Sequence, residues 1–284
     1  MSEPELLVSV VQHVATLTIN RPAQRNALSW QLMADLRQAL VDAKGDPTVR
    51  VVVLTGAGDR AFCAGADLTG MADGAGYADL HDARGELARV FRELWELGKP
   101  TIARVRGFAL AGGFGLAMAC DLVVAADDAQ FATPEIDVGL WPHMITVPLT
   151  RSMPPKVALE LMMTGRRVDA AEALRIGFVN RVVPVDGAGG LDETIDEMAA
   201  TLAAKSPVAL KLGRDSFYGV WDLAAEDALR YLHPMLTVTA STDDAAEGIA
   251  AFRDKRPPRW SADGFCLFRN SRCPTVRSHE RTRA

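Results

Sequence analysis

Two short stretches rich in glycine and alanine could bring backbone N–H groups close to a ligand. They are AFCAGADL at 61–68 and GFALAGGFG at 107–115, and each follows a strand-like run. Side chains this small cannot act as acids or bases, but they let backbone N–H groups approach a ligand oxygen without obstruction. Two such donors converging on one oxygen would form an oxyanion hole. Either stretch taken alone also fits a plain tight turn.

Two candidate acid or base side chains, Glu135 and His143, follow the second stretch. Glu135 lies in TPEIDVG, and His143 follows eight residues later in GLWPHMI. Carboxylates and imidazoles are common general acids and bases, and imidazole titrates near neutral pH. His143 also fits a pocket-lining or core histidine bonded to backbone. Asp137, two residues after Glu135, fits a structural or solvated loop charge.

The sequence lacks the motifs of several other enzyme and cofactor-binding classes. The strand-like VVVLTG leads into G-x-G-x-x-A, but Asp59-Arg60 then opens another loop instead of the helix that a dinucleotide-binding turn requires. The sequence contains no G-x-S-x-G, H-E-x-x-H or G-x-x-x-x-G-K-[ST]. The four cysteines show no paired metal-ligand spacing, so we expect reduced thiols and no metal site.

Composition indicates a globular protein that does not bind nucleic acid. The 284 residues are 49% hydrophobic and 24% charged, with a net charge of −5, and no apolar run approaches the roughly 20 residues that span a bilayer. The charge is uneven, because residues 261–284 hold five Arg against two acids. An acidic body disfavours phosphate binding. The acidic N-terminus lacks signal-peptide features, and we expect a cytoplasmic protein without membrane contact.

Hydrophobic periodicity predicts an α/β core followed by a mostly helical C-terminal part. Ser29 is a candidate N-cap for the helix at 30–44. The strands are expected at 6–11, 13–20, 49–56, 101–110, 121–127, 130–133 and 178–184. Further helices are expected at 79–97, 113–119, 155–163, 169–176, 191–205, 207–218, 222–236 and 243–254.

Three segments together resemble the crotonase superfamily, the enoyl-CoA hydratases and isomerases. They are NRPAQRNAL, AFCAGADL and GFALAGGFGLAMACDLVVAADDAQFATPE, and the resemblance covers about residues 6–260. It implies a spiral of strand-strand-helix turns in a core at 1–200 and a helical trimerisation region at 201–260. A basic tail at 261–284 lies beyond the resemblance, and we expect it to be mobile. The assembly implied is a homotrimer or a dimer of trimers.

The resemblance also implies a binding site for an acyl-CoA thioester, with CoA entering as part of the substrate and no separate cofactor. The oxyanion donors would be the backbone N–H groups of Ala66 and Gly112. Glu135 would be the catalytic carboxylate. The expected substrate-binding residues are Arg25, Ala64, Asp67, Leu68, Thr69 and Gly113.

The sequence departs from the family pattern at two positions. Hydratases of the family carry two glutamates, and Gly115 stands where the first is expected. His143 stands where the family's dienoyl-CoA isomerases carry a catalytic Asp, which makes it a candidate second acid or base. Hydration is the more frequent activity in the family, whereas a single carboxylate suffices for a Δ3-Δ2 isomerase. A non-catalytic acyl-CoA-binding homologue is the third hypothesis.

Overall fold

The computed structural model describes residues 3–67 and 76–261. The chain divides into two compact units, Met1–Lys205 and Ser206–Ala284. Residues Leu68 and Thr69, and all of the expected tail except Ser261, lie outside the described residues. No helix within 3–67 or 76–261 is long and apolar enough to cross a membrane.

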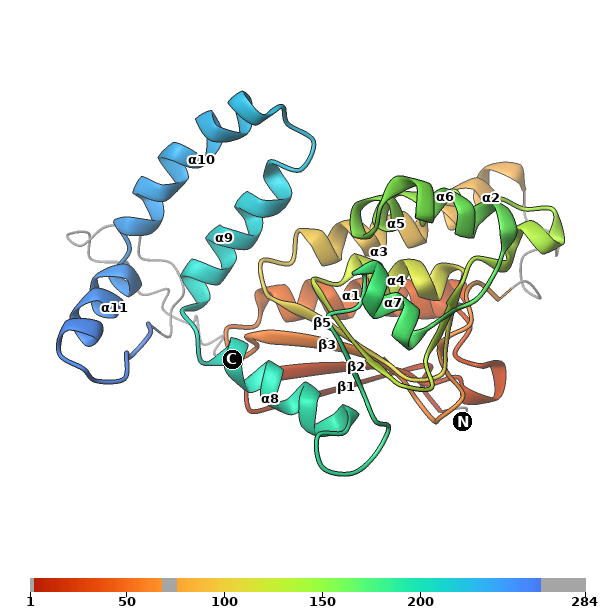
Figure 1. Ribbon diagram of the computed structural model, residues 1–284, viewed down its shortest axis with the longest axis horizontal. Coiled ribbons are helices and arrows are strands. Elements are labelled where there is room, and N and C mark those ends of the chain that lie inside the picture. The colour runs from red at the N-terminus through yellow and green to blue at the C-terminus, as the bar shows by residue number, and fades with distance from the viewer. Residues whose placement is uncertain (1–2, 68–75, 262–284) are drawn as a thin grey trace, which may run out of the picture. The chain divides into compact units, whose positions relative to one another are not determined.

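A six-stranded sheet forms the centre of the first unit (Figure 1). Only β1 pairs antiparallel, through the predicted hairpin with β2, and the other pairings are parallel. The run Val51–Leu54 is buried, as expected for a parallel strand covered on both faces. In spatial order the strands are β1 (Leu6–Val11), β2 (Val14–Ile19), β3 (Val51–Gly56), β5 (Thr101–Val105), β7 (Leu122–Ala126) and β10 (Arg181–Val183).

A second sheet of four short strands lies beside the first. Its order is β4 (Ala61–Cys63), β6 (Phe108–Leu110), β8 (Gln130–Ala132) and β9 (Val168–Asp169). The successive pairs β3–β4, β5–β6 and β7–β8 each place one strand in each sheet, which makes the repeated strand-strand-helix turn. The α/β spiral predicted from the sequence is therefore confirmed.

The sequence prediction of one strand over 101–110 is wrong. The chain turns at Gly107, where φ is +62°, and passes from the first sheet to the second. A side chain at this position would overlap the backbone carbonyl of Arg60. Glycine is therefore required both by the backbone conformation and by the close approach of two chain segments.

Helices cover both faces of the six-stranded sheet (Figure 1). One face packs against α1 (Trp30–Gly45), α3 (Glu86–Trp95) and α4 (Gly112–Ala119), and the other packs against α8 (Leu191–Ala203). Ser29 caps α1, because its hydroxyl accepts the N–H of Leu32 at 3.0 Å.

Two further differences concern helices near the cavity described below. The helix expected over 79–97 is two helices, α2 (Tyr77–Arg84) and α3, that meet at Gly85. A helix that the sequence analysis missed, α5 (Thr146–Ser152), contains Pro148 and is only one or two turns long. The remaining helices of this unit are α6 (Pro155–Thr164) and α7 (Ala170–Ile176), with the 3₁₀ turns η1 (Pro22–Gln24) and η3 (Pro134–Val138).

The second unit contains α9 (Pro207–Gly219), α10 (Ala225–Ala240) and α11 (Asp243–Arg253). Ser206 joins two of these helices, since its hydroxyl caps α9 and donates to the buried carboxylate of Asp244 at 2.5 Å. Large apolar side chains are exposed on all three helices: Phe217, Leu229, Leu236, Ile249 and Phe252. Such side chains fit an interface between copies, and the trimerisation region stays a prediction.

Replacing Phe131 by Ala should destabilise the first unit by about 3–5 kcal/mol. Phe131 is fully buried and its ring contacts those of Phe114 and Phe178, with centroids 5.3 and 5.2 Å away. Urea unfolding followed by circular dichroism measures the loss. Tyr77→Ala is the control, because Tyr77 is 84% exposed, and an equal loss in both variants would contradict the packing described here.

Candidate active site

The two glycine-rich loops lie against each other. A Cβ added to Gly65 would be 2.6 Å from the Cβ of Ala111 and 3.4 Å from the backbone nitrogen of Gly112. A Cβ added to Gly112 would be 3.9 Å from the backbone nitrogen of Ala66. The backbone nitrogens of Ala66 and Gly112 are therefore neighbours.

The pairing of Leu28 with Ala66 decides the direction of one of these N–H groups. Leu28 donates to the carbonyl of Gly65 at 2.7 Å and accepts the N–H of Asp67 at 2.9 Å. Successive N–H groups of an extended chain point to opposite sides. The N–H of Ala66 therefore points away from Leu28. Gly112 is the first residue of α4, where backbone N–H groups have no acceptor within the helix.

Ala111 holds an unusual backbone conformation between β6 and α4. Its φ of +50° and ψ of −126° are rarely adopted by residues with a side chain. Conformations of this kind cost on the order of 1–3 kcal/mol and persist only where the surroundings enforce them. Here the N–H of Ala111 donates to the carbonyl of Ala132 at 2.9 Å, and the Cβ packs next to Gly65. The strain lies at the residue that sets the direction of the Gly112 N–H.

Arg21 and Asn26 brace the first loop. The guanidinium of Arg21 contacts the carboxylates of Glu5 and Asp67, each at 2.9 Å, and donates to the carbonyl of Ala27 at 2.6 Å. The side-chain amide of Asn26, which is 1% exposed, accepts the N–H of Arg21 and donates to carbonyls in the segment before β4 and at its start. These charge-assisted and buried hydrogen bonds fix the loop relative to β2.

Glu135 reaches the same place from η3, immediately after β8. Its carboxyl group is largely buried, and burial raises the pKa above the ordinary value of 4.5, while a hydrogen bond with its own backbone N–H opposes the rise. The Oε2 atom is buried and has no hydrogen-bond partner among the described residues. A partly desolvated carboxylate with a free oxygen can accept a proton.

Gly115, in α4, faces the side chain of Ile145, which precedes α5. A Cβ at Gly115 would overlap the Cγ2 of Ile145 and lie 2.8 Å from its Cβ and 3.0 Å from the Cζ of Phe91. Ile145 is 2% exposed. The absence of a carboxylate at position 115 is therefore matched by an apolar side chain that fills the adjoining space.

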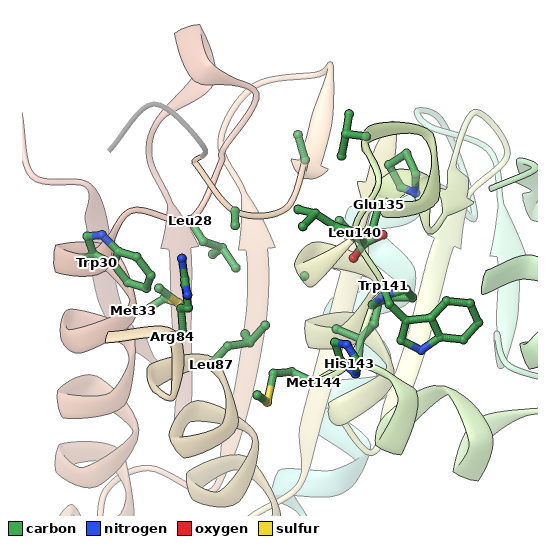
Figure 2. Close-up of a pocket in the computed structure, with 18 residues that line it drawn as sticks. Leu28, Trp30, Met33, Arg84, Leu87, Glu135, Leu140, Trp141, His143 and Met144 are labelled. Carbon is green, nitrogen blue, oxygen red and sulfur yellow. The ribbon is translucent and has the colours of Figure 1, made fainter. Parts of the chain in front are cut away.

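A cavity of about 360 Å³ joins these elements. Its volume is in the range of small-molecule sites. Figure 2 shows Leu28, Trp30, Met33, Arg84 and Leu87 on one side and Glu135, Leu140, Trp141 and His143 on the other. Ala64, Ala66, Ala111, Gly112, Pro134, Val138, Pro142, Met144 and Ile145 complete the lining. We refer to it as the Glu135 cavity.

The comparisons with known proteins agree with this arrangement. A family model described as Enoyl-CoA hydratase/isomerase matches residues 10–263. This chain belongs to that family. It is 38% identical over 255 residues to a 2,3-dehydroadipyl-CoA hydratase of Escherichia coli, covering 89% of this chain and 97% of the other. It is 35% identical over 252 residues to a carnitinyl-CoA dehydratase of Proteus mirabilis, covering 87% and 94%.

A solved structure has the same fold. The crystal structure of an enoyl-CoA hydratase from Mycobacterium smegmatis matches with a TM-score of 0.85 at 37% identity, over 91% of this chain and 99% of that chain. The crotonase resemblance inferred from the sequence is thereby confirmed.

The site residues expected from the sequence fall into three groups. Glu135, His143, Ala64, Ala66 and Gly112 line the Glu135 cavity, and the imidazole of His143 is exposed there without a hydrogen bond to the described residues.

Three other expected residues do not line the cavity. Asp67 is paired with Arg21, and Gly113 is buried where a Cβ would overlap the carbonyl of Cys63. Arg25 is exposed, and its carbonyl accepts the N–H of Ala64 at 3.0 Å. Leu68 and Thr69 lie outside the described residues.

The sequence analysis missed the wall contributed by α1, α2 and α3. Trp30, Met33, Arg84 and Leu87 line the cavity, but each belongs to a helical stretch whose periodicity indicates only packing against the sheet. No feature of the sequence separates a side chain that closes a cavity from one that fills a core.

Two other reactive possibilities find no support in this part of the chain. Burial raises the pKa of the Cys63 thiol to about 12, so it is not a nucleophile near neutral pH. Among the described residues, no group of three or more His, Cys, Asp or Glu side chains could hold a metal ion.

Replacing Glu135 by Gln should raise the thermal stability at pH 8. A carboxyl group whose pKa is raised by folding contributes stability below its ordinary pKa and loses that contribution as the pH rises through the folded value. Gln cannot ionise and escapes this loss. The melting temperature of Glu135→Gln relative to the wild type should therefore fall as the pH is lowered from 8 to 5.

The control for this pH series is Glu96→Gln, which changes an exposed carboxylate. We expect its melting temperature to follow that of the wild type across the range. A difference between Glu135→Gln and the wild type that is independent of pH would contradict the proposed effect of burial.

Proposed function

We propose that this protein is an enoyl-CoA hydratase-type enzyme with one catalytic carboxylate. The observation that carries the proposal is the meeting of the Ala66 and Gly112 backbone nitrogens beside a buried, unpartnered Glu135 oxygen in one cavity. The thioester carbonyl of an acyl-CoA would accept both N–H groups. Each donor of this kind is worth about 3–4 kcal/mol when negative charge develops on the oxygen.

The backbone donors act first in this mechanism. They stabilise the enolate that forms when a nucleophile adds to the β-carbon or when a proton leaves a carbon next to the double bond. Ala66 is held by its pairing with Leu28, and Gly112 by the strained turn at Ala111, so the donors are fixed before the substrate arrives. Preorganised donors need not reorient during the reaction.

Glu135 then carries the proton. In hydration its carboxylate accepts a proton from water while the hydroxyl oxygen bonds to C3. The electron pair of the C2–C3 double bond then forms a C1–C2 double bond, and the carbonyl electron pair moves to the thioester oxygen, which gives the enolate. Glu135 returns the proton to C2 as the carbonyl reforms. One carboxylate thus acts as base and then as acid, and burial, which raises the pKa of Glu135, makes it a stronger base. His143, exposed at the same cavity, is a second candidate for the proton transfer.

A Δ3-Δ2 enoyl-CoA isomerase is the second candidate, and Ile145 favours it. An apolar, buried side chain beside Gly115 occupies the region where a second carboxylate would activate water. Isomerisation needs only one base, which removes a proton from C2 and returns it to C4. We place hydration first because hydratases are the more frequent members of the family and relatives of this chain carry hydratase names.

Glu135→Gln should reduce turnover by about 10²- to 10⁴-fold, because the amide cannot accept the proton. Crotonyl-CoA tests hydration, and 3-hexenoyl-CoA tests isomerisation. Incorporation of ¹⁸O from labelled water separates the two products. The pH 8 melting temperature shows that any loss of turnover does not come from unfolding.

Each outcome of this assay decides between the hypotheses. Activity that survives in Glu135→Gln on both substrates would reject the proposed mechanism. A wild-type protein that binds these thioesters without converting either of them would favour the non-catalytic homologue.

Gly115→Glu should destabilise the protein by at least about 1–3 kcal/mol, because its Cβ overlaps Ile145 in a packed region. In an Ile145→Gly background the same change should cost less, since Ile145 has been removed. Urea unfolding of the four proteins completes the double-mutant cycle. We expect hydration of crotonyl-CoA to increase from Ile145→Gly to the double variant.

The cycle has a clear negative result. If Gly115→Glu costs the same stability with and without Ile145, the two positions are independent. Ile145 would then not be the side chain that excludes a glutamate from position 115.

A further inference from the structure

Arg84 is an exposed cation at the edge of an otherwise mostly apolar cavity. It is the last residue of α2, and its side chain lines the Glu135 cavity together with Leu28, Met33 and Leu87. Figure 2 shows the Arg84 guanidinium beside Trp30 and Met33 on the side of the cavity away from Glu135. An arginine remains charged at any pH at which the protein is folded.

Asp82 and Glu86, which are close to Arg84 in the sequence, have other ionic partners. Arg89 forms ion pairs with Asp82 and with Glu86, and Arg37 also contacts Glu86 at 3.5 Å. A carboxylate oxygen of Asp79 lies near the start of α2, 3.4 Å from the position of a Cβ on Gly76. Within 3–67 and 76–261, no acidic side chain forms an ion pair with Arg84.

Glu135 does not neutralise Arg84 either. The pKa of Glu135 is raised by burial and lowered only by its own backbone N–H, whereas a nearby guanidinium would lower it by direct attraction. Among the described residues, the cavity therefore contains a carboxylate oxygen without a hydrogen-bond partner on one side and a guanidinium without an ion pair on another. A methyl-terminated acyl chain would interact neither with the positive charge of Arg84 nor with its hydrogen-bond donors.

We propose that Arg84 binds a carboxylate at the far end of the acyl chain, so that the preferred substrates are enoyl-CoA thioesters of dicarboxylic acids. A guanidinium presents paired N–H donors that match the two oxygens of a carboxylate. The surrounding side chains of Leu28, Met33 and Leu87 accommodate the methylene groups between the two ends. The assignment of a reacting thioester at Glu135 rests on the proposed function.

The test compares two substrates of equal length, hex-2-enoyl-CoA and its carboxylate-ended analogue 5-carboxypent-2-enoyl-CoA. The variants are Arg84→Met, which removes the charge, and Arg84→Lys, which keeps it. Arg92→Met is the matched control, because Arg92 is an exposed arginine of α3 that does not line the cavity. We expect Arg84→Met to lower kcat/KM about tenfold or more for the carboxylate-ended substrate relative to the methyl-ended substrate, mainly through KM.

Arg84→Lys should recover part of that loss, and Arg92→Met should behave as the wild type. An equal loss on both substrates would assign Arg84 to the phosphates of CoA and overturn the proposal. No loss on the carboxylate-ended substrate would also overturn it.

Binding of the saturated thioesters separates this proposal from the proposed reaction. Calorimetry gives Kd for hexanoyl-CoA and 5-carboxypentanoyl-CoA without turnover. A selective loss of affinity for the second ligand in Arg84→Met supports the role of Arg84 even if neither enoyl thioester is converted. A wild-type enzyme that converts both enoyl thioesters but binds the two saturated ligands equally would keep the reaction and reject the carboxylate site.

Discussion

The close packing of two loops is the constraint on which the site depends. Gly65 leaves space for Ala111, and Gly113 leaves space for the carbonyl of Cys63, so the loop after β4 and the loop after β6 can touch. Their contact places the nitrogens of Ala66 and Gly112 side by side. Because a backbone N–H cannot be redirected by a change of rotamer, its direction is set by the fold itself, including the strained conformation of Ala111.

The fold also determines which side chain meets these donors. The chain crosses from one sheet to the other in each turn of the spiral, and η3 follows the third such crossing, after β8. Glu135 is thereby brought to the loops after β4 and β6, although Ala66 is far away in the sequence. The neighbouring α5 begins next to Ile145, whose side chain fills the space beside Gly115. The same short segment supplies the carboxylate and removes room for another.

Local signals in the sequence predicted much of this arrangement. The alternation at 6–20 predicted the hairpin, and Ser29 caps α1 as expected. The change of sheet at Gly107 was missed because TIARVRGFAL is continuously strand-like, and only the backbone of Arg60 makes the glycine necessary. Residues that build the loops could be recognised from their composition. The cavity wall at Arg84 could not be recognised from the sequence, because the helices that form it are separated in the sequence from the loops that they contact.

The separation of Glu135 and Arg84 in the cavity allows one to act as a base and the other to bind an anionic group. A cation beside Glu135 would stabilise its ionised form and lower its pKa, making the carboxylate a weaker base. Burial raises the pKa of Glu135, and no ion pair joins its carboxylate to Arg84 among the described residues. An arginine on a separate wall can therefore attract an anionic group of the substrate without weakening the base. Separation of the two charges preserves proton transfer at one end of the acyl chain while allowing selection at the other.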